Sequence, residues 1–279
     1  MQIFGCTYYT WFLQQTQLYF RENPLAFSMK SCYNPTNRQS PCFSPERLVF
    51  RQPAGIYEVI SMKKADIISI VNALKEAYPD SICSLQYAKD YELLFAVRLS
   101  AQCTDERVNK VTPALFARFP TLESFAEADP EEVGEYIHSC GFFRGKSRDM
   151  VLSAQMLLRD YGGKVPCTME DLLKLPGVGR KTANLILGDI FRTPGVVVAD
   201  THCIRITGRL GLTDGTRDPA KVEQQLRKIL PPDESNNFCH RLVLHGRAVC
   251  TARTAKCGEC VLVSWCKYAK TEFKKVKKA

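Results

Sequence analysis

The sequence lacks a long apolar run, a fixed-period repeat and more than a few strand-like segments. Without about 20 consecutive apolar residues, no helical membrane span is predicted. Acidic residues are in deficit, with 29 Asp and Glu against 38 Lys and Arg and a formal net charge of +9. The excess of cations favours a polyanionic partner, nucleic acid first and an anionic membrane surface second. A basic protein with no such partner is also common, so charge alone decides little.

The 13 cysteines do not form a disulfide framework of the kind found in small secreted proteins. Their number is odd and they are scattered through a long chain, whereas such frameworks are short and evenly paired. No basic region precedes the apolar N-terminal stretch, so no secretory signal is predicted. We expect a reducing compartment, which for a bacterial source is the nucleoid-containing cytoplasm.

Residues 1–61 differ from the rest of the chain. They begin with an aromatic, almost uncharged stretch and continue with one rich in Pro, Ser and Asn, without clean periodicity. Met62 stands directly before the first well-formed helical pattern. Two interpretations are equally supported: a loosely ordered N-terminal extension, and a translated upstream segment that is not part of the working protein.

From residue 62 onward the pattern is helical. Apolar residues recur at spacings of three and four, and helix starts are marked by N-cap candidates at Thr104, Asp129 and Asp218, the last two each followed by proline. The best strand candidate, "GVVVAD" at residues 195–200, is short. The fold class predicted is therefore all-α.

The stretch "LPGVGRKTAN", residues 175–184, predicts a glycine hairpin between two helices. Gly177 and Gly179 can adopt positive φ and leave backbone N–H groups uncovered at the mouth of a helix starting near Arg180. Such N–H groups bind a DNA phosphate without reading a base. An ordinary helix connection with one glycine cap is the alternative, and it explains two glycines and two cations less well. A nucleotide-binding P-loop fits worse, because the Gly-Lys-Ser/Thr ending is missing.

Four cysteines gather in the last thirty residues, in "CTARTAKCGECVLVSWC". Four thiolates this close in sequence can hold a structural zinc or a [4Fe–4S] cluster. Zinc ribbons usually pair two close Cys-x-x-Cys hairpins, and only one close pair exists here, which favours iron–sulfur. The candidate ligands are Cys250, Cys257, Cys260 and Cys266.

Together with this cysteine spacing, the segments "RLSAQCTD", "LPGVGRKTANLIL" and "VADTHCIRITGRLGL" resemble the endonuclease III family. Its members are bifunctional DNA glycosylase/AP lyases of the helix-hairpin-helix–GPD superfamily. The resemblance runs from about residue 62 to residue 270. It implies two helical lobes, a six-helix bundle with a helix-hairpin-helix and an iron–sulfur helical domain, flanking a DNA-binding cleft.

The resemblance also implies a domain organisation. The six-helix domain is expected at residues 85–193, and the iron–sulfur domain is expected to combine residues 62–84 with residues 194–270. Residues 271–279 form a basic tail, and residues 1–61 are not covered by the resemblance.

The family's catalytic lysine and aspartate match Lys181 and Asp200. The reaction needs a neutral amine that attacks C1′ of the damaged nucleoside. A helix N-terminus disfavours the ammonium form, which explains a lysine in the first turn of a helix. Asp200 can stabilise the positive charge that grows on the sugar and can move protons. The alternatives are a phosphate-binding lysine and an aspartate that only caps the next helix.

Further positions match DNA contacts of the family. Gln102 matches a glutamine that fills the gap left by an extruded base, and Phe142 stands where relatives often carry an apolar wedge. His202 is a candidate for the wall of the base pocket. The expected DNA contacts are Gly177, Val178, Gly179, Arg180, Gln102, Phe142 and His202.

The resemblance implies oxidised or ring-fragmented pyrimidines and abasic sites in double-stranded DNA as substrates. It further implies one [4Fe–4S] cluster, a Lys Schiff base and strand cleavage 3′ to the lesion by β-elimination. We expect a monomer without a membrane partner. Two other classes remain: a DNA-binding protein without catalysis, and an iron–sulfur electron carrier.

Overall fold

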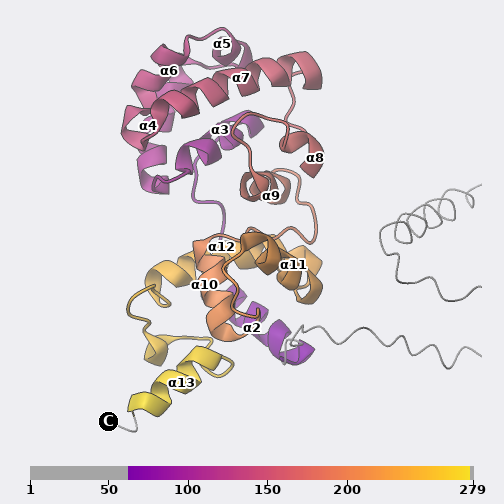
Figure 1. Cartoon of the computed structure of the whole chain (residues 1–279), viewed down its shortest axis with the longest axis vertical. Helices are drawn as coiled ribbons and strands as arrows, with labels where there is room; N and C mark the ends of the chain where they lie inside the picture. The colour runs from indigo at the N-terminus through magenta and orange to yellow at the C-terminus, as the bar shows by residue number, and fades with distance from the viewer. Residues whose placement is uncertain (1–61, 277–279) are drawn as a thin grey trace, which may run out of the picture. The chain divides into compact units, whose positions relative to one another are not determined.

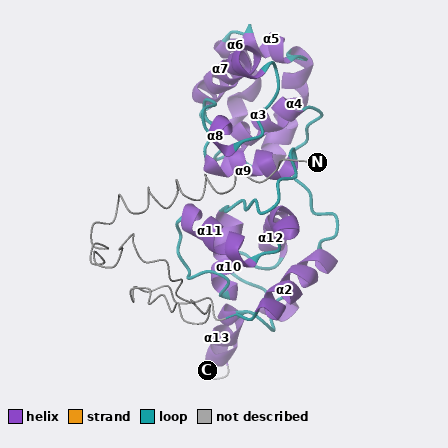
Figure 2. Ribbon diagram, turned by 90° about the vertical axis from the view of Figure 1, so that its right-hand side faces the viewer, coloured by secondary structure: helices purple, strands orange, loops and turns teal. Residues whose placement is uncertain are grey.

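The computed structural model describes residues 62–276, with side chains as far as residue 271. The extension predicted at residues 1–61 lies outside the described residues, as does the end of the basic tail. All regular elements in the described part are helical, and its only β-type pairing is an isolated bridge between Cys250 and Ala255. The all-α prediction is confirmed, and Figures 1 and 2 show the helices. Within the same residues, no helix is long and apolar enough to cross a membrane.

The elements follow one another as a series of helices of very different length. The α-helices are α2 (Lys64–Ala77), α3 (Asp90–Ser100), α4 (Asp105–Arg118), α5 (Leu122–Ala126), α6 (Pro130–Ile137), α7 (Phe143–Tyr161), α8 (Met169–Leu172), α9 (Arg180–Asp189), α10 (Thr201–Leu210), α11 (Pro219–Ile229), α12 (Ser235–Ala248) and α13 (Lys267–Val276). The 3-10 turns are η2 (His138–Cys140), η3 (Pro232–Glu234) and η4 (Cys257–Glu259).

The predicted helix starts are confirmed by their caps. The Thr104 hydroxyl accepts the Arg107 N–H before α4. Carboxylates do the same before α6 and α11, where Asp129 and Asp218 each accept an N–H two residues on. Each cap satisfies a donor that the helix itself leaves unpaired, which is why these residue types mark the boundaries.

The best strand candidate of the sequence, residues 195–200, does not form a strand. These residues have no strand neighbour and run as an irregular segment. The three valines of this segment are buried. Val196 packs in one hydrophobic core, while Val197 and Val198 pack in another. A short apolar run of this kind indicates burial, but it forms a β-strand only where a neighbouring strand pairs with it.

The first core is formed by helices α3 to α9. At its centre, the ring of Phe125 lies 4.9 Å from that of Phe95 and 5.1 Å from that of Phe119, measured between centroids. These offset and edge contacts are favourable arrangements for aromatic rings. The helix α7, the longest described, packs along α5 and α6 and so covers this core.

The second core is built from segments far apart in the sequence. It joins α2, near the start of the described chain, to α10, α11, α12 and α13. Ile67, Ile70, Val71 and Leu74 of α2 are buried in it, on the face predicted from their spacing.

Polar contacts connect the helices of the two cores. The guanidinium of Arg180 in α9 donates two hydrogen bonds of 2.8 Å to the carboxylate of Glu223 in α11. The buried amide of Asn184 donates to the same carboxylate at 2.9 Å. Leu185, on the same helix, packs against both cores. The helix α9 is therefore attached to both groups of helices, and it carries the lysine singled out by the sequence.

Candidate active site

Lys181 and Asp200 line the same pocket, which we call the Lys181 pocket. Lys181 is the second residue of α9, and Asp200 directly precedes α10, so two helix N-termini meet here. The pocket measures about 190 Å³. That is below the roughly 300–1,000 Å³ of a site for a drug-sized ligand, and it suits a single small group. The Lys181 side chain is exposed, so its amine is accessible.

The glycine hairpin before α9 has the predicted left-handed turn at Gly177 but not at Gly179, which is extended with φ of −98° because it is the N-cap of α9. Gly177 has φ of 71°, in the left-handed region that glycine adopts without steric cost. A Cβ at this position would lie 2.3 Å from Nε of Arg98 and 2.5 Å from Oδ2 of Asp149. These two side chains form an ion pair of 2.6 Å, so the hairpin backbone rests directly on a salt bridge that leaves no room for a side chain.

The N–H groups of the hairpin are only partly available. The Val178 N–H donates to the Leu175 carbonyl at 3.1 Å, and the Val178 side chain is buried in the first core. The first backbone bond of α9 runs from the Ala183 N–H to the Gly179 carbonyl at 2.9 Å. The N–H groups before Ala183 therefore have no partner within the helix and form its positive end. The guanidinium of Arg180 is bound to Glu223, so its predicted phosphate contact stays a prediction.

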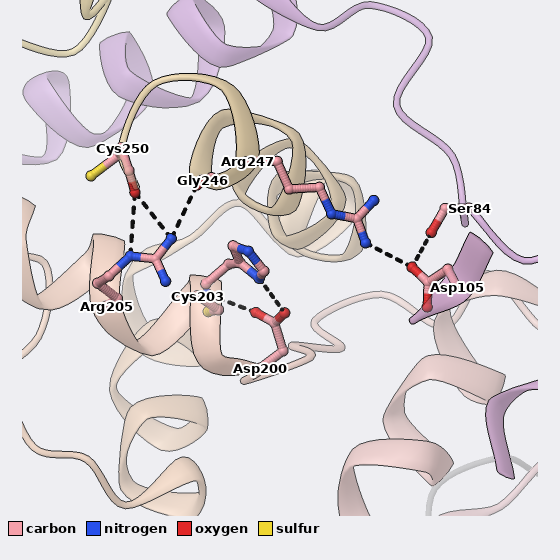
Figure 3. A network of polar contacts seen from close by, with 9 residues as sticks. Ser84, Asp105, Asp200, Cys203, Arg205, Gly246, Arg247 and Cys250 are labelled. Atoms are coloured by element: carbon pink, nitrogen blue, oxygen red, sulfur yellow. Dashed lines mark hydrogen bonds and ion pairs between the residues drawn. The ribbon is translucent and has the colours of Figure 1, made fainter. Parts of the chain in front are cut away.

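Asp200 is held by two hydrogen bonds and is mostly buried, with 14% of its side chain exposed. It caps α10 by accepting the Cys203 N–H at 2.7 Å (Figure 3). Its other oxygen lies 3.1 Å from Nδ1 of His202. Burial raises the pKa of Asp200, but the bonds from His202 and Cys203 and the charge of Lys181 outweigh it. The pKa of Asp200 is lowered overall, so the carboxylate is ionised at neutral pH.

His202 is placed by a close approach between α10 and α12. A Cβ on Gly246 of α12 would lie 2.5 Å from Cδ2 of His202. The neighbouring Arg205 donates to the Gly246 carbonyl at 3.3 Å and to the Cys250 carbonyl at 3.0 Å (Figure 3). His202 lines the Lys181 pocket, and its predicted role in the wall of the base pocket stays a prediction.

Several residues of the pocket were missed by sequence analysis. Asp105, at the start of α4, accepts hydrogen bonds from Ser84 and, at 2.8 Å, from Arg247 of α12 (Figure 3). Cys83 also lines the pocket, and burial, followed by the charge of Asp189, raises the pKa of its thiol to about 12. The Cys83 thiol is therefore protonated at neutral pH, and Cys83 lines the pocket without being a second nucleophile. No motif unites these residues, since they come from separate helices and loops.

Gln102 and Phe142 face a second hollow, separate from the Lys181 pocket. They are two of three non-glycine residues with left-handed φ in the described chain, at 56° and 48°. Phe142 is 73% exposed, although phenyl rings are usually buried. The structure thus brings together the two predicted wedge residues, which stand forty positions apart.

The four cysteines near the C-terminus gather beside the second core. Burial, and then the neighbouring Cys250, Cys266 and Cys257, raise the pKa of Cys260. Arg209 donates to Cys250 Sγ at 3.3 Å, the Ala269 N–H donates to Cys266 Sγ at 3.5 Å, and Nε2 of His245 lies 3.4 Å from Cys260 Sγ. Donors of this kind stabilise thiolates that hold a metal centre.

No group of three or more His, Cys, Asp or Glu in the described chain is arranged to hold a metal ion. An iron–sulfur cluster has several irons between its thiolates, so its ligands lie further apart than those of a single ion. Cys260 lies near the other three cysteines, and N–H groups donate to the sulfurs of Cys250 and Cys266, so these four residues fit such a cluster.

The chain is similar to known base excision repair proteins. Residues 95–232 match the family model described as "HhH-GPD superfamily base excision DNA repair protein". The chain is 46% identical to endonuclease III of Synechocystis sp. over 213 residues, which are 76% of this chain and 97% of that protein. It is 37% identical to endonuclease III of Bacillus subtilis over 205 residues, 74% and 93% of the two chains.

A solved structure has the same fold. It is titled "Structure of a Trapped Endonuclease III-DNA Covalent Intermediate: Estranged-Adenine Complex", and it is 37% identical. It aligns with a TM-score of 0.71 over 76% of this chain and 99% of the other. The chain therefore belongs to the endonuclease III family of base excision DNA repair enzymes, which are DNA glycosylases with AP lyase activity.

Proposed function

We propose that this enzyme releases oxidised pyrimidines from double-stranded DNA and cleaves the strand 3′ to the resulting abasic site, with Lys181 as nucleophile and Asp200 as its partner. The observation that carries the proposal is that the exposed amine of Lys181 and the ionised carboxylate of Asp200 line one small pocket. Lys181 is the second residue of α9 and shares the pocket with Asp200, so the two groups that the reaction needs are brought together by two helix N-termini.

In the proposed reaction, the Lys181 amine bonds to C1′ of the damaged nucleotide, and the bond from C1′ to the base breaks. The departing base takes up a proton, and the amine nitrogen gives up one proton after it has bonded to C1′. The C1′–O4′ bond then breaks, O4′ takes up a proton, and the nitrogen forms a protonated Schiff base with C1′. Removal of a proton from C2′ then expels the 3′ phosphate by β-elimination. Asp200 stabilises the positive charge on the sugar and imine because it is ionised and partly desolvated.

DNA is proposed to bind through backbone groups of the hairpin and through the wedge residues. The unpaired N–H groups at the start of α9 suit a phosphate. A noncovalent endonuclease III–DNA complex is among the solved structures with the same fold, at 37% identity. In this proposal the side chains of Gln102 and Phe142 fill the gap that the damaged nucleotide leaves in the duplex, and His202 lines the pocket that receives the base. The chain is proposed to act as a monomer.

The four clustered cysteines are proposed to hold one [4Fe–4S] cluster. The chain folds around them between the end of α12 and the start of α13, and Arg209 binds this segment through the carbonyls of Thr251 and Ala252 at 2.7 and 3.0 Å. When bound, the cluster would fix this loop covalently. We propose the domain boundaries given above, since each of the two cores is built almost wholly from one predicted domain.

Borohydride reduction on DNA with an abasic site tests the proposal, because it converts a Schiff base into a stable covalent adduct. The intact protein should form the adduct, and Lys181→Ala should not. Lys221→Ala is the matched control, since Lys221 is also an exposed cation in the first turn of a helix, α11, and does not line the pocket. An adduct that persists in Lys181→Ala, or no adduct with the intact protein, would overturn the assignment.

A further inference from the structure

Lys146 is a buried lysine to which neither the reaction nor the DNA contacts above give a role. It lies in the first turn of α7, where the helix dipole disfavours a cation, and it is only 1% exposed. Burial lowers its pKa, although neighbouring Cys103 and Cys140 act in the opposite direction. A cation placed against both burial and a helix dipole requires compensation from its contacts.

The compensation comes from three backbone carbonyls. The Nζ of Lys146 donates to the carbonyls of Leu99 and Ala101 at 2.8 Å and to that of Cys140 at 2.9 Å. An ammonium group has three N–H donors, so all of them are used. The three acceptors belong to two separate segments, the end of α3 with the turn after it and the turn between α6 and α7.

These two turns carry the two wedge candidates. Gln102 directly follows Ala101, and Phe142 is two residues after Cys140. Both have left-handed φ, a conformation that side-chain-bearing residues adopt only when their surroundings impose it. Their side chains line one hollow, to which Lys146 also contributes.

We infer that Lys146 is a positioning residue, which ties the two turns together so that Gln102 and Phe142 enter the duplex as one rigid unit. The inference rests on the proposed function, because it assumes that these side chains fill the space left by an extruded nucleotide. Lys146 itself touches no DNA in this scheme. Its effect is to hold two backbone segments at a constant separation, and a wedge that is displaced by about 1 Å can cost about 100-fold in rate.

The first test compares base extrusion with DNA affinity in Lys146→Met, which keeps most of the side-chain volume and removes the three N–H donors. Extrusion is followed by the fluorescence of 2-aminopurine next to a thymine glycol in a duplex, and affinity by fluorescence anisotropy at fixed salt. We expect extrusion and the rate of base release to fall about 100-fold. Affinity should change less than about threefold, because phosphate contacts supply most of it.

Lys110→Met is the matched control, since Lys110 forms only a surface pair of 2.9 Å with Glu106 and should leave both readouts unchanged. Equal losses of extrusion and affinity in Lys146→Met would indicate a general loss of structure and would overturn the inference. So would unchanged extrusion. Failure of the intact protein to form the borohydride adduct would instead remove the proposed function.

A second test avoids the buried site. Gln102→Ala, Phe142→Ala and the double variant alter exposed side chains, so they are expected to fold. If the two turns act as one unit, each single change should cost nearly as much extrusion as the double change. Adding Lys146→Met to the double variant should then cost less than about threefold more. Losses that simply multiply would overturn the inference, whether or not Lys146→Met folds.

Discussion

Asp200 has two separable tasks, and a pair of substitutions distinguishes them. Its carboxylate caps α10 through the Cys203 N–H at 2.7 Å and is also the proposed partner of Lys181. Asparagine caps helices about as well as aspartate, whereas alanine does not cap them. Asp200→Asn should therefore keep most of the folding stability and lose strand cleavage, while Asp200→Ala should lose strand cleavage and part of the folding stability.

The magnitudes follow from the contacts. Loss of an N-cap costs about 1 kcal/mol, and loss of the second bond, to His202 at 3.1 Å, costs about 1 kcal/mol more. Asp200→Ala should thus lower the free energy of unfolding by about 2 kcal/mol, or the melting temperature by about 4–8 °C for a chain of this size. Asp218→Ala is the control, because Asp218 caps α11 in an exposed position away from the pocket, and it should cost about 1 kcal/mol.

Cleavage of abasic DNA and urea unfolding measure the two tasks independently. Both Asp200 variants should lower the rate constant for cleavage by about 10²–10⁴, the range for loss of an acid–base group. Asp218→Ala should cleave at the wild-type rate. An Asp200→Asn variant that cleaves DNA as fast as the wild type would refute the reasoning.

The stability difference between wild type and Asp200→Asn should depend on pH. The pKa of Asp200 is lowered in the folded protein, so the ionised carboxylate contributes stability above its unfolded value of about 3.9. That contribution is lost as the pH falls through the lower, folded value. The difference between the two unfolding free energies should therefore be present at pH 7 and should shrink below about pH 4.

Two further outcomes test the hairpin and the cysteine cluster. Gly177→Ala should cost about 2–4 kcal/mol in urea unfolding, because it combines positive φ with a contact of 2.3 Å to Arg98, whereas Gly162→Ala, with φ of 58° and open space around it, should show the backbone cost alone. Equal costs would contradict the close approach. Cys260→Ser should abolish the broad brown absorption expected of an iron–sulfur protein, and Cys167→Ser, at an exposed site elsewhere, should retain it. A colourless wild type would contradict the cluster.

The local sequence was sufficient to predict several helix starts and the turn at Gly177. Caps at Thr104, Asp129 and Asp218 depend on contacts within three residues, and the left-handed turn at Gly177 depends on a residue without a Cβ. Such features are decided by the chain itself, so their sequence signature is direct. The apolar run at residues 195–200 shows what local sequence cannot predict. Its burial follows from its composition, but the presence or absence of a neighbouring strand does not.

The candidate site divides in the same way. The sequence by itself determined the helical class and pointed to Lys181 and Asp200 through motifs whose spacing is local. Only the tertiary structure decided that these residues share a pocket, that Arg180 binds Glu223, and that Lys146 ties the turn before α4 to the turn before α7. The physical reason is that these groups come from segments far apart in the chain: Arg180 and Glu223 are 43 positions apart, and Ala101 and Lys146 are 45 apart. No periodicity or cap encodes which distant carboxylate or carbonyl a cation will meet.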